Sequence, residues 1–385
     1  MNANIVAVGV NDWDLRFFEN QYPVPQGISY NSYIVAGDER TAVLDAMDIR
    51  CVDRWMAQVK SALPEERCPD YLVVHHMEPD HSAGIARFML EFPEARIVAS
   101  RAAINMLAQF FPDGNFADRT VAVSDGSTLE LGGGDSLRFL SAPMVHWPEV
   151  MVSFHPGSGT LFSADAFGSF GCVSDGSDRW PDEARRYYAN IVGKYGDQVQ
   201  SLLKKVAALP VSTIAPLHGA VLDGDLSRYI GLYDRWSRWQ PEVPDGVLVA
   251  FTSIYGGTAE AAGMIADLLQ RRGLPVVVAD LLHTDMSEAV SQAFRMGRLV
   301  LCSITYEGGV MASMRDFLSR LASKGLRDRR IGLVQNGSWA PAAAKIMRDS
   351  LAACKGMTFA EPVVTIKSRL NAAVRALVAD LAGAM

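Results

Sequence analysis

A regular alternation of apolar runs and helical patterns constrains the second part of this sequence more than any other feature. From residue 247 onward, five runs rich in β-branched residues each precede a segment with helical spacing. Because parallel strands need a long crossover connection, usually a helix, this order is typical of a doubly wound parallel sheet. The expected strands are 247–252, 276–281, 299–303, 331–335 and 363–366, and the expected helices are 258–272, 286–296, 311–322, 340–353 and 369–382.

The preceding residues mix short β-branched runs with helical patches, which predicts an α/β domain of two sheets covered by helices. The stretch WQPEVPDG at 239–246 concentrates proline, glycine and charge, and it marks a linker. We therefore expect two domains, 1–242 and 243–385. In the first, the expected strands are 33–35, 41–44, 71–74, 96–98, 120–123, 137–140, 151–154 and 213–215, and the expected helices are 52–63, 102–111 and 182–209.

Composition excludes several classes of protein. The 385 residues include 36 basic and 43 acidic side chains, so the net charge of −7 argues against a nucleic-acid partner. No run approaches the roughly 20 apolar residues that cross a bilayer, and the N-terminus lacks the basic region of a secretory signal, so we expect a cytoplasmic protein. The five cysteines are scattered without a CxxC pair, and each is expected to be a small core residue: Cys51, Cys68, Cys172, Cys302 and Cys354.

The densest group of potential metal ligands follows the expected strand 71–74. Residues 74–84 read VHHMEPDHSAG, which places His76, Glu78, Asp80 and His81 within six positions. In an extended segment alternate residues face one side, so the first three can converge while His81 reaches round as the chain turns. A polar loop capped by Asp80 is the simpler interpretation of such a run, but the density of ligands favours a metal site.

Three further candidates, His146, Asp165 and His218, each follow an apolar strand and precede a turn. Together the set contains four histidines and three acids, enough for two metal ions if one carboxylate bridges them. No cysteine is among them, so the ligands suit iron, manganese or zinc. Three carboxylates favour an ion that cycles between the ferrous and ferric states over a hydrolytic zinc pair.

In the second domain, three loops are expected to meet at one sheet edge. In a sheet of order 2-1-3-4-5 the loops after the first, third and fourth strands lie together at the carboxyl edge. These loops read SIYGGT, SITYEGGV and QNGSWAPAA, and they combine a hydroxyl- and glycine-rich phosphate cradle with the aromatic rings of Tyr306 and Trp339. The expected flavin-site residues are Ser253, Ile254, Tyr255, Gly256, Gly257, Thr258, Ile304, Thr305, Tyr306, Glu307, Gly308, Gly309, Asn336, Gly337, Ser338 and Trp339.

These motifs resemble the flavodiiron proteins, in which a metallo-β-lactamase-like αββα sandwich precedes a flavodoxin-like domain that binds FMN. Glu78 occupies a position that is histidine in the zinc hydrolases of the superfamily. The flavin loops depart from the family only in Glu307 and in the pair Ala340 and Pro341. The resemblance implies that Asp165 bridges two irons, one held by His76, Glu78 and His146 and the other by Asp80, His81 and His218.

The resemblance also implies a reaction and partners. It implies reduction of dioxygen to water, of nitric oxide to nitrous oxide, or both, with FMN relaying electrons to the diiron centre. It implies a head-to-tail homodimer, or a dimer of such dimers, in which each flavin serves the irons of the other chain. Because the sequence has no cysteine-rich extension, we expect a separate electron donor, such as rubredoxin, a reduced deazaflavin or another reductase.

Two other functions compete with this interpretation. The first is a dinuclear zinc hydrolase of the same superfamily with a flavodoxin appendage, and the second is a non-catalytic electron-transfer or gas-sensing module. Near the proposed irons, His75, Tyr22, Trp147 and Tyr188 are candidates for contacts to the ligands, although core packing is the simpler role for each.

Overall fold

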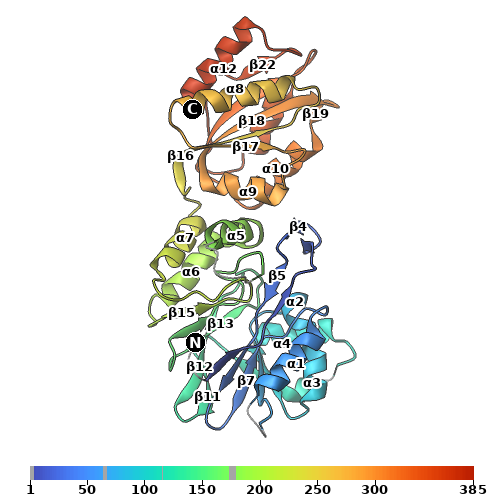
Figure 1. The fold of residues 1–385 in the computed structure, drawn as a ribbon, viewed down its shortest axis with the longest axis vertical. Helices are drawn as coiled ribbons and strands as arrows, with labels where there is room; N and C mark the ends of the chain where they lie inside the picture. The colour runs from blue at the N-terminus through green and yellow to red at the C-terminus, as the bar shows by residue number, and fades with distance from the viewer. Residues whose placement is uncertain (1–3, 64–66, 115, 173–178) are drawn as a thin grey trace. The chain divides into compact units, whose positions relative to one another are not determined.

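The computed structural model describes residues 4–63, 67–114, 116–172 and 179–385. The chain forms two compact units, one from Met1–Tyr188 with Asp197–Asp234 and the other from Ala189–Gly196 with Arg235–Met385 (Figure 1). The boundary expected between residues 242 and 243 stays a prediction. Within the described ranges, no helix is both long enough and apolar enough to cross a membrane.

Two sheets form the centre of the first unit. The first sheet contains, in spatial order, β1 (Ile5–Ala7), β6 (Tyr33–Ala36), β7 (Thr41–Leu44), β8 (Tyr71–Val74), β9 (Arg96–Ser100) and β10 (Thr120–Val123). The second contains β11 (Thr128–Gly132), β12 (Asp135–Ser141), β13 (Met151–His155), β14 (Thr160–Phe162) and β15 (Thr213–Ala215). Two short ribbons pair β2 (Val10–Asp12) with β5 (Ile28–Tyr30), and β3 (Phe17–Phe18) with β4 (Tyr22–Pro23).

Helices cover the outer faces of these sheets (Figure 1). On the side of the first sheet lie α1 (Val52–Ala62), α3 (Ile85–Glu91) and α4 (Arg101–Phe110), and on the side of the second lie α6 (Gly196–Val206) and α7 (Ser227–Ser237). Apolar side chains of both sheets form one buried cluster between them, with Leu44 and Val73 from the first sheet and Phe139 and Phe162 from the second. The expected αββα sandwich is therefore confirmed.

The single helix expected over 182–209 is wrong. The chain instead forms α5 (Trp180–Tyr187), a π turn at Tyr188–Val192, a 3-10 turn at Gly193–Tyr195 and then α6. Two glycines within four residues weaken the helix. Gly196 also lies against the backbone at Ser237, where an added Cβ would stand 2.2 Å from the carbonyl oxygen. This close approach explains the glycine at that position and the change of direction there.

The second unit contains the expected parallel sheet, in the order β17 (Val276–Asp280), β16 (Val243–Phe251), β18 (Met296–Tyr306) and β20 (Arg330–Asn336). Two short strands, β21 (Thr358–Phe359) and β22 (Val364–Ile366), both pair with β20 and together occupy the last position of the sheet. Strand β19 (Gly309–Val310) pairs antiparallel with β18. Helices α8 (Gly257–Arg271) and α12 (Ala372–Ala384) lie on one side of the sheet, and α9 (Met286–Arg295) and α10 (Ala312–Ser323) on the other (Figure 1). The doubly wound 2-1-3-4-5 order explains the alternation in the sequence.

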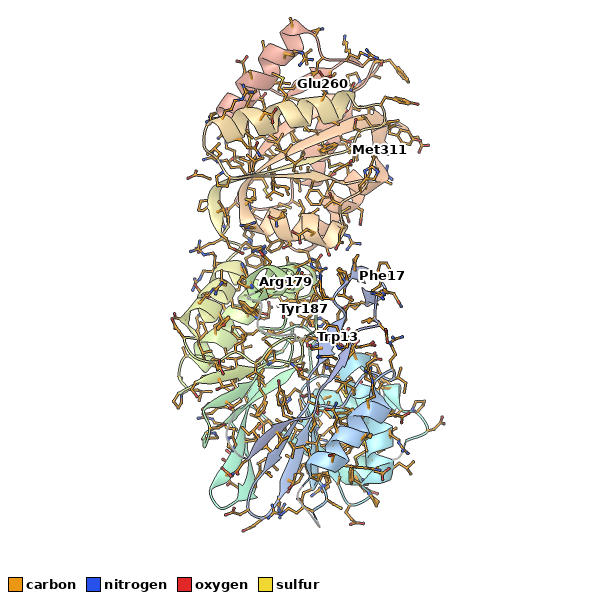
Figure 2. All side chains as sticks on the ribbon, viewed as in Figure 1. Trp13, Phe17, Arg179, Tyr187, Glu260 and Met311 are labelled. Carbon is orange, nitrogen blue, oxygen red and sulfur yellow. The ribbon has the colours of Figure 1, made fainter. Side chains whose placement is uncertain are left out.

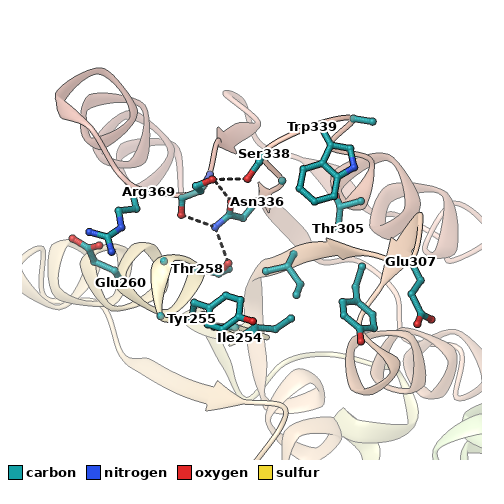
Figure 3. Close-up of a pocket in the computed structure, with 18 of the residues that line it drawn as sticks. Ile254, Tyr255, Thr258, Glu260, Thr305, Glu307, Asn336, Ser338, Trp339 and Arg369 are labelled. Atoms are coloured by element: carbon teal, nitrogen blue, oxygen red, sulfur yellow. Dashed lines mark hydrogen bonds between the residues drawn. The ribbon is translucent and has the colours of Figure 1, made fainter.

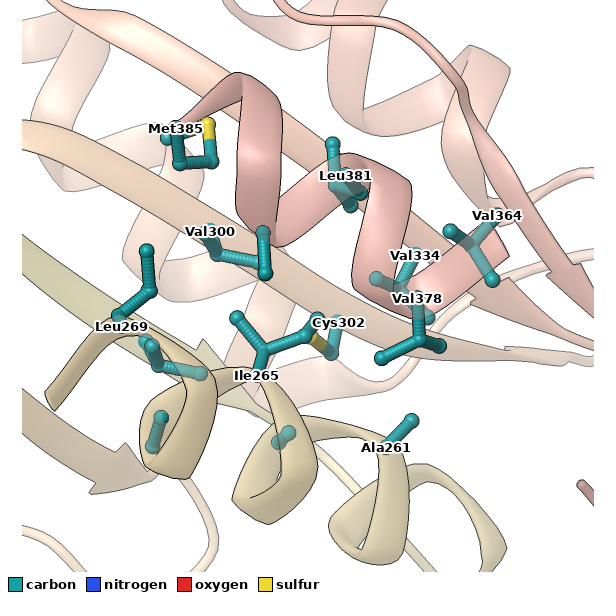
Figure 4. Close-up of a cluster of buried hydrophobic side chains, with 14 of the residues drawn as sticks. Ala261, Ile265, Leu269, Val300, Cys302, Val334, Val364, Val378, Leu381 and Met385 are labelled. Atoms are coloured by element: carbon teal, nitrogen blue, oxygen red, sulfur yellow. The ribbon is translucent and has the colours of Figure 1, made fainter. Parts of the chain in front are cut away.

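The core of this unit is formed where α8 and α12 pack on the sheet (Figure 4). Ile265 and Leu269 of α8 and Leu381 of α12 cover Val300 of β18, and all four side chains are fully buried. The helix expected over 340–353 begins only at α11 (Ala343–Ser350). Pro341 disfavours the helical region at Ala340, whose φ is +43°.

The cysteines divide between core and surface. Cys51 and Cys302 are buried, as expected, but Cys68 is exposed, and Cys172 and Cys354 are half-buried. The expectation of five core cysteines is therefore wrong for these three. All three lie outside the helices and strands, where connecting segments run over the surface.

A buried polar link joins the two sheets of the first unit. Nδ1 of His75, just after β8, lies 2.5 Å from Oδ2 of Asp45, just after β7, and its Nε2 lies 2.8 Å from the hydroxyl of Ser153 in β13. The backbone N–H of His75 also donates to Asp45. All three side chains are buried. This link fixes the backbone immediately before His76.

We predict that His75→Phe lowers the free energy of unfolding by about 3–5 kcal/mol, because it leaves the buried Asp45 carboxylate without its imidazole partner. Urea unfolding of metal-depleted protein, followed by circular dichroism, measures the change. His283→Phe is the control, since that histidine pairs with Asp280 on the surface and is 80% exposed. Equal stability of the two variants would show that the link contributes nothing.

Candidate metal and flavin sites

The seven predicted metal ligands come from four segments of the first unit, each of which follows a strand. His76 and Glu78 follow β8, and the one-turn helix α2 (Pro79–Ser82) carries Asp80 and His81. The loop between β12 and β13 carries His146, while Asp165 follows β14 and His218 follows β15. The structure brings all seven together in two groups: His76, Glu78, His146 and Asp165, and Asp80, His81 and His218.

One expectation from the sequence pattern is wrong here. Alternation along an extended segment would turn Asp80 to the same side as His76 and Glu78. Because helix α2 begins at Pro79, Asp80 instead faces His81 and His218, with its Oδ2 3.2 and 3.3 Å from their Nε2 atoms. A proline at the first position of a helix is a common start signal, which explains the change of direction.

Within the first group, Oε2 of Glu78 lies 3.2 Å from Nε2 of His76 and 3.0 Å from Nε2 of His146. In the second, the Nε2 atoms of His81 and His218 lie 3.0 Å apart. Asp165 lies between the groups. Its Oδ2 is 3.4 and 3.2 Å from Nε2 of His76 and His146, and its Oδ1 is 3.4 and 3.7 Å from Nε2 of His81 and His218. One carboxylate oxygen therefore faces each group.

These residues fit a pair of metal ions. Both carboxylate oxygens of Asp80 and of Asp165 are buried, and none makes a hydrogen bond to any described residue. A buried carboxylate without partners is costly unless it is paired or coordinates a metal. Ligand atoms bound about 2.0–2.2 Å from one ion stand about 3 Å from each other, which matches the separations within each group. Nitrogen and oxygen donors without thiolate are a donor set for iron, manganese or zinc.

The electrostatics of the cluster favour added positive charge. Burial acts to raise the pKa of Asp165, yet the imidazoles of His146 and His81 hold it well below its usual value. Burial acts to lower the pKa of His76, but Glu149 and Glu78 raise it to about 10. For His146, Asp165 and Glu78 overcome burial and raise the pKa to about 9. In the absence of a metal, protons take the place of a cation among these carboxylates.

Several contacts around the ligands were not predicted from the sequence. The Nδ1–H of His76 donates to Glu149 over 2.8 Å, and that of His218 donates to the carbonyl oxygen of Ser29 over 2.9 Å. Aromatic rings surround His218, with centroids 5.2 Å away at Phe18, 5.7 Å at Tyr30 and 5.4 Å at Tyr187, which lies at the end of α5 (Figure 2). The only available signal for Glu149 was its place three residues after His146.

The four candidates for contacts to the ligands have different positions. The ring of Trp147 meets His76 edge-on at 5.1 Å, so it covers the first group. Tyr22 packs on Phe170, and Tyr188 packs on Tyr233. His75 belongs to the link between the sheets described above.

We predict that Asp165→Ala lowers the metal content of reconstituted protein from about two ions per chain to about one or fewer, because each group loses a shared oxygen ligand. Elemental analysis after anaerobic reconstitution with ferrous iron measures the content. Asp125→Ala removes an exposed carboxylate that pairs with Lys205, and it is expected to change nothing. Full metal content in Asp165→Ala would contradict the prediction.

A cavity of about 950 Å³ lies at the carboxyl edge of the parallel sheet in the second unit (Figure 3). Its walls are the three expected loops and a fourth, after β22, which carries Ser368 and Arg369. Every predicted flavin-site residue lines it except Gly309, which lies in β19. Glu260 and Ala340 also line it and were not predicted. Because β22 runs parallel to β20, its following loop emerges at the same edge.

One end of this cavity has the features of a phosphate site. Gly256 has a φ of +84°, and it places the free N–H groups at the start of α8 towards the cavity. The hydroxyl of Ser253 is buried and makes no hydrogen bond within the described chain, so it is available to an anion. Asn336 holds this end together, since its side chain bonds Thr258 and the backbone of Ser368 (Figure 3).

Aromatic side chains stand exposed around the rest of the cavity. Tyr255 is 97% exposed, Trp339 82% and Tyr306 43%. Three large rings left open to solvent around one cavity indicate a surface that a planar ligand covers. The residues therefore fit FMN, with the phosphate on the start of α8 and the ring system among the aromatic side chains.

We predict that Gly257→Ala weakens FMN binding, because the added Cβ would stand 2.6 Å from the carbonyl oxygen of Ser368 and push the phosphate loop away. A strain of about 1–3 kcal/mol corresponds to an increase of about 5- to 160-fold in Kd. Fluorescence titration of flavin-free protein measures it. Gly263→Ala, in the same helix with open space around it, is the matched control. Equal affinity in both variants would contradict this account of the loop.

Comparison with known proteins finds relatives that match most of this chain. A family model described as ODP family beta lactamase matches residues 28–219. The chain is 31% identical over 290 residues to a putative diflavin flavoprotein of Synechocystis sp., covering 74% of this chain but only 49% of that relative. It is 33% identical to a coenzyme F420H₂ oxidase of Methanothermobacter marburgensis (84% of this chain, 80% of the relative) and 28% identical to a nitric oxide reductase of Moorella thermoacetica (94% and 91%).

Among solved structures, the fold is similar to that of the rubredoxin oxygen:oxidoreductase from Desulfovibrio gigas. The TM-score is 0.91 at 23% identity, over 99% of this chain and 96% of that one. At this identity the likeness shows the fold alone, a sandwich followed by a doubly wound sheet.

Proposed function

This chain belongs to the flavodiiron proteins, a family of oxidoreductases that carry FMN and a diiron centre, and we propose that it reduces dioxygen to water, nitric oxide to nitrous oxide, or both. Dioxygen requires four electrons and four protons to give two waters. Two nitric oxide molecules require two electrons and two protons to give nitrous oxide and one water. The names of the relatives, an oxidase and a nitric oxide reductase, support both substrates.

The observation that carries this proposal is the position of Asp165, with one buried carboxylate oxygen towards each group of ligands. In the proposed site, His76, Glu78 and His146 hold one iron and Asp80, His81 and His218 hold the other. Bound iron supplies open coordination positions for a diatomic gas and one-electron changes of oxidation state, and FMN supplies the electrons one at a time.

The residues around the ligands have supporting roles in this proposal. Phe18, Tyr30 and Tyr187 form an apolar wall beside His218, which favours a small apolar gas over water near the second group. Burial, followed by the nearby carboxylates, raises the pKa of Tyr187 well above its usual value, so its hydroxyl keeps its proton. In the flavin pocket, Ser253 and Thr258 orient the phosphate, and the exposed rings hold the flavin in place.

The proposal includes two kinds of partner. A separate donor supplies electrons to FMN, and the first candidates are coenzyme F420H₂, which is a reduced deazaflavin, and rubredoxin, because the names of two similar proteins contain them. A second copy of this chain is the other partner, in a homodimer in which the flavin of one chain serves the irons of the other.

We predict that protein reconstituted with iron and FMN consumes nitric oxide or dioxygen when a reduced donor is supplied. Gas electrodes under otherwise anaerobic conditions measure both rates on one preparation. Asp165→Ala is expected to abolish consumption of both gases. In Gly257→Ala, the rate of gas consumption falls because FMN binds weakly, and it is expected to return to the wild-type rate when FMN is in excess.

The competing function predicts a different outcome. Purified protein that holds zinc, hydrolyses a thioester or a similar bond, and consumes neither gas when loaded with iron would identify a hydrolase instead. The ratio of the two gas rates on iron-loaded protein assigns the preferred substrate.

A further inference from the structure

The two groups of metal ligands have the same donors. Each contains two histidines and one carboxylate of its own, Glu78 in the first and Asp80 in the second, and Asp165 presents one oxygen to each. The donor types alone therefore give no reason for one position to bind a metal more tightly than the other. Groups that contact the ligands from outside can distinguish the two positions.

The outer nitrogens of the histidines have different partners. His76 and His218 both direct Nε2 into the cluster, which leaves Nδ1–H to donate outward. In the first group, Nδ1 of His76 meets the carboxylate of Glu149 at 2.8 Å. In the second, Nδ1 of His218 meets the neutral carbonyl of Ser29, and the buried Nδ1 of His81 makes no hydrogen bond to a described residue.

Glu149 is fixed in this contact through one oxygen, Oε1, while its Oε2 is buried and makes no hydrogen bond to a described residue. Its side chain is fully buried, and the same Oε1 that meets His76 also accepts the backbone N–H of Met77 over 2.9 Å. Its backbone carbonyl accepts the hydroxyl of Ser100 over 2.8 Å. Glu149 thus joins the loop that carries His76 to the loop that carries His146, the two histidines of the first group.

A carboxylate behind an imidazole changes the ligand. Hydrogen bonds to an ionised acceptor are about twice as strong as neutral ones, and a carboxylate partner fixes the ring and increases the basicity of the coordinating nitrogen. The negative charge of Glu149 is also buried, so a cation at the first position is attracted by a charge that has no counterpart among the described residues in hydrogen-bond contact with the histidines of the second.

We propose that Glu149 is a positioning residue that makes the first group, His76, Glu78 and His146, the tighter of the two metal positions and the first to fill. This inference rests on the proposed two-metal site, and it adds an order to the occupation of the two positions. Removal of an outer partner of this kind typically weakens metal binding about 10- to 100-fold.

The test uses cobalt(II) and the full-length, metal-depleted protein, with each position isolated in turn. His218→Ala impairs the second position and leaves the first, whereas His146→Ala does the reverse. Visible absorption follows the titrations. Glu149→Gln keeps the shape and the acceptor oxygen but removes the charge. We expect it to raise the Kd about 10- to 100-fold in the His218→Ala protein and by less than about threefold in the His146→Ala protein.

Two controls separate a local effect from general damage. Asp135→Asn removes the charge of a carboxylate that lies 3.3 Å from the buried His155. His155 is the last residue of β13, at the opposite end of that strand from the loop with Glu149, so both Kd values are expected to stay unchanged. Circular dichroism reports folding. If Glu149→Gln fails to fold, Glu149→Asp, which keeps the charge but withdraws it by one methylene, is expected to weaken the first position selectively.

The outcomes distinguish this inference from the proposed function. Wild-type protein that binds no cobalt would overturn the two-metal site itself. Equal losses at both positions, or no loss at the first, would overturn the role of Glu149 and leave the site intact. If neither single-position protein binds cobalt, the two stepwise Kd values for cobalt are compared between the wild type and Glu149→Gln. We expect Glu149→Gln to reduce the ratio of these two Kd values about 10- to 100-fold. An unchanged ratio would contradict the inference.

Discussion

Both carboxylate oxygens of Asp165 are buried between two groups of histidines, and neither makes a hydrogen bond to a described residue. Transfer of such a charge into a protein interior costs several kcal/mol unless cations compensate it. The first unit contains a second such group in Asp80 and is nevertheless closely packed around both. Its architecture is therefore best understood as a support for cation binding, in which four segments at strand ends hold buried carboxylates beside histidines.

The second unit meets the charge of its proposed ligand in a different way. Among the described residues that line the phosphate end of its cavity, no carboxylate or cation is buried, and hydroxyls and backbone N–H groups at the start of α8 provide the donors. Arg369, on the loop after β22, is the only basic side chain among the described residues that line the cavity. A dianion held by neutral donors near solvent needs no buried countercharge, which is compatible with the cluster of apolar side chains where α8 and α12 pack on the sheet.

Features with a local cause could be predicted from the sequence. The alternation after residue 247 predicted the parallel sheet because each strand and its helix are neighbours in sequence. Ligands at strand ends were identifiable because the residue types are unusual and their positions follow apolar runs. Where a local pattern competed with a turn, the prediction failed: Asp80 was assigned by strand alternation, and the helix that begins at Pro79 directs it to the other group.

Contacts between distant segments had no such signal. Glu149 lies 73 residues from His76, and the carbonyl of Ser29 lies 189 residues from His218. Apart from the place of Glu149 three residues after His146, nothing in either stretch distinguishes these residues from any other acid or carbonyl near a turn. The fourth wall of the cavity was missed for the same reason, since Ser368 contacts Asn336 across 32 residues.

This difference between local and distant information has a chemical consequence for the metal site. The ligand motif in the sequence describes two positions with equal donors, and from that motif alone the two would bind metals equally. Only the folded chain introduces an inequality, because it places an anion behind His76 and a neutral carbonyl behind His218. Glu149, which makes the two positions unequal, lies outside the ligand motif, on the loop from which the motif uses only His146.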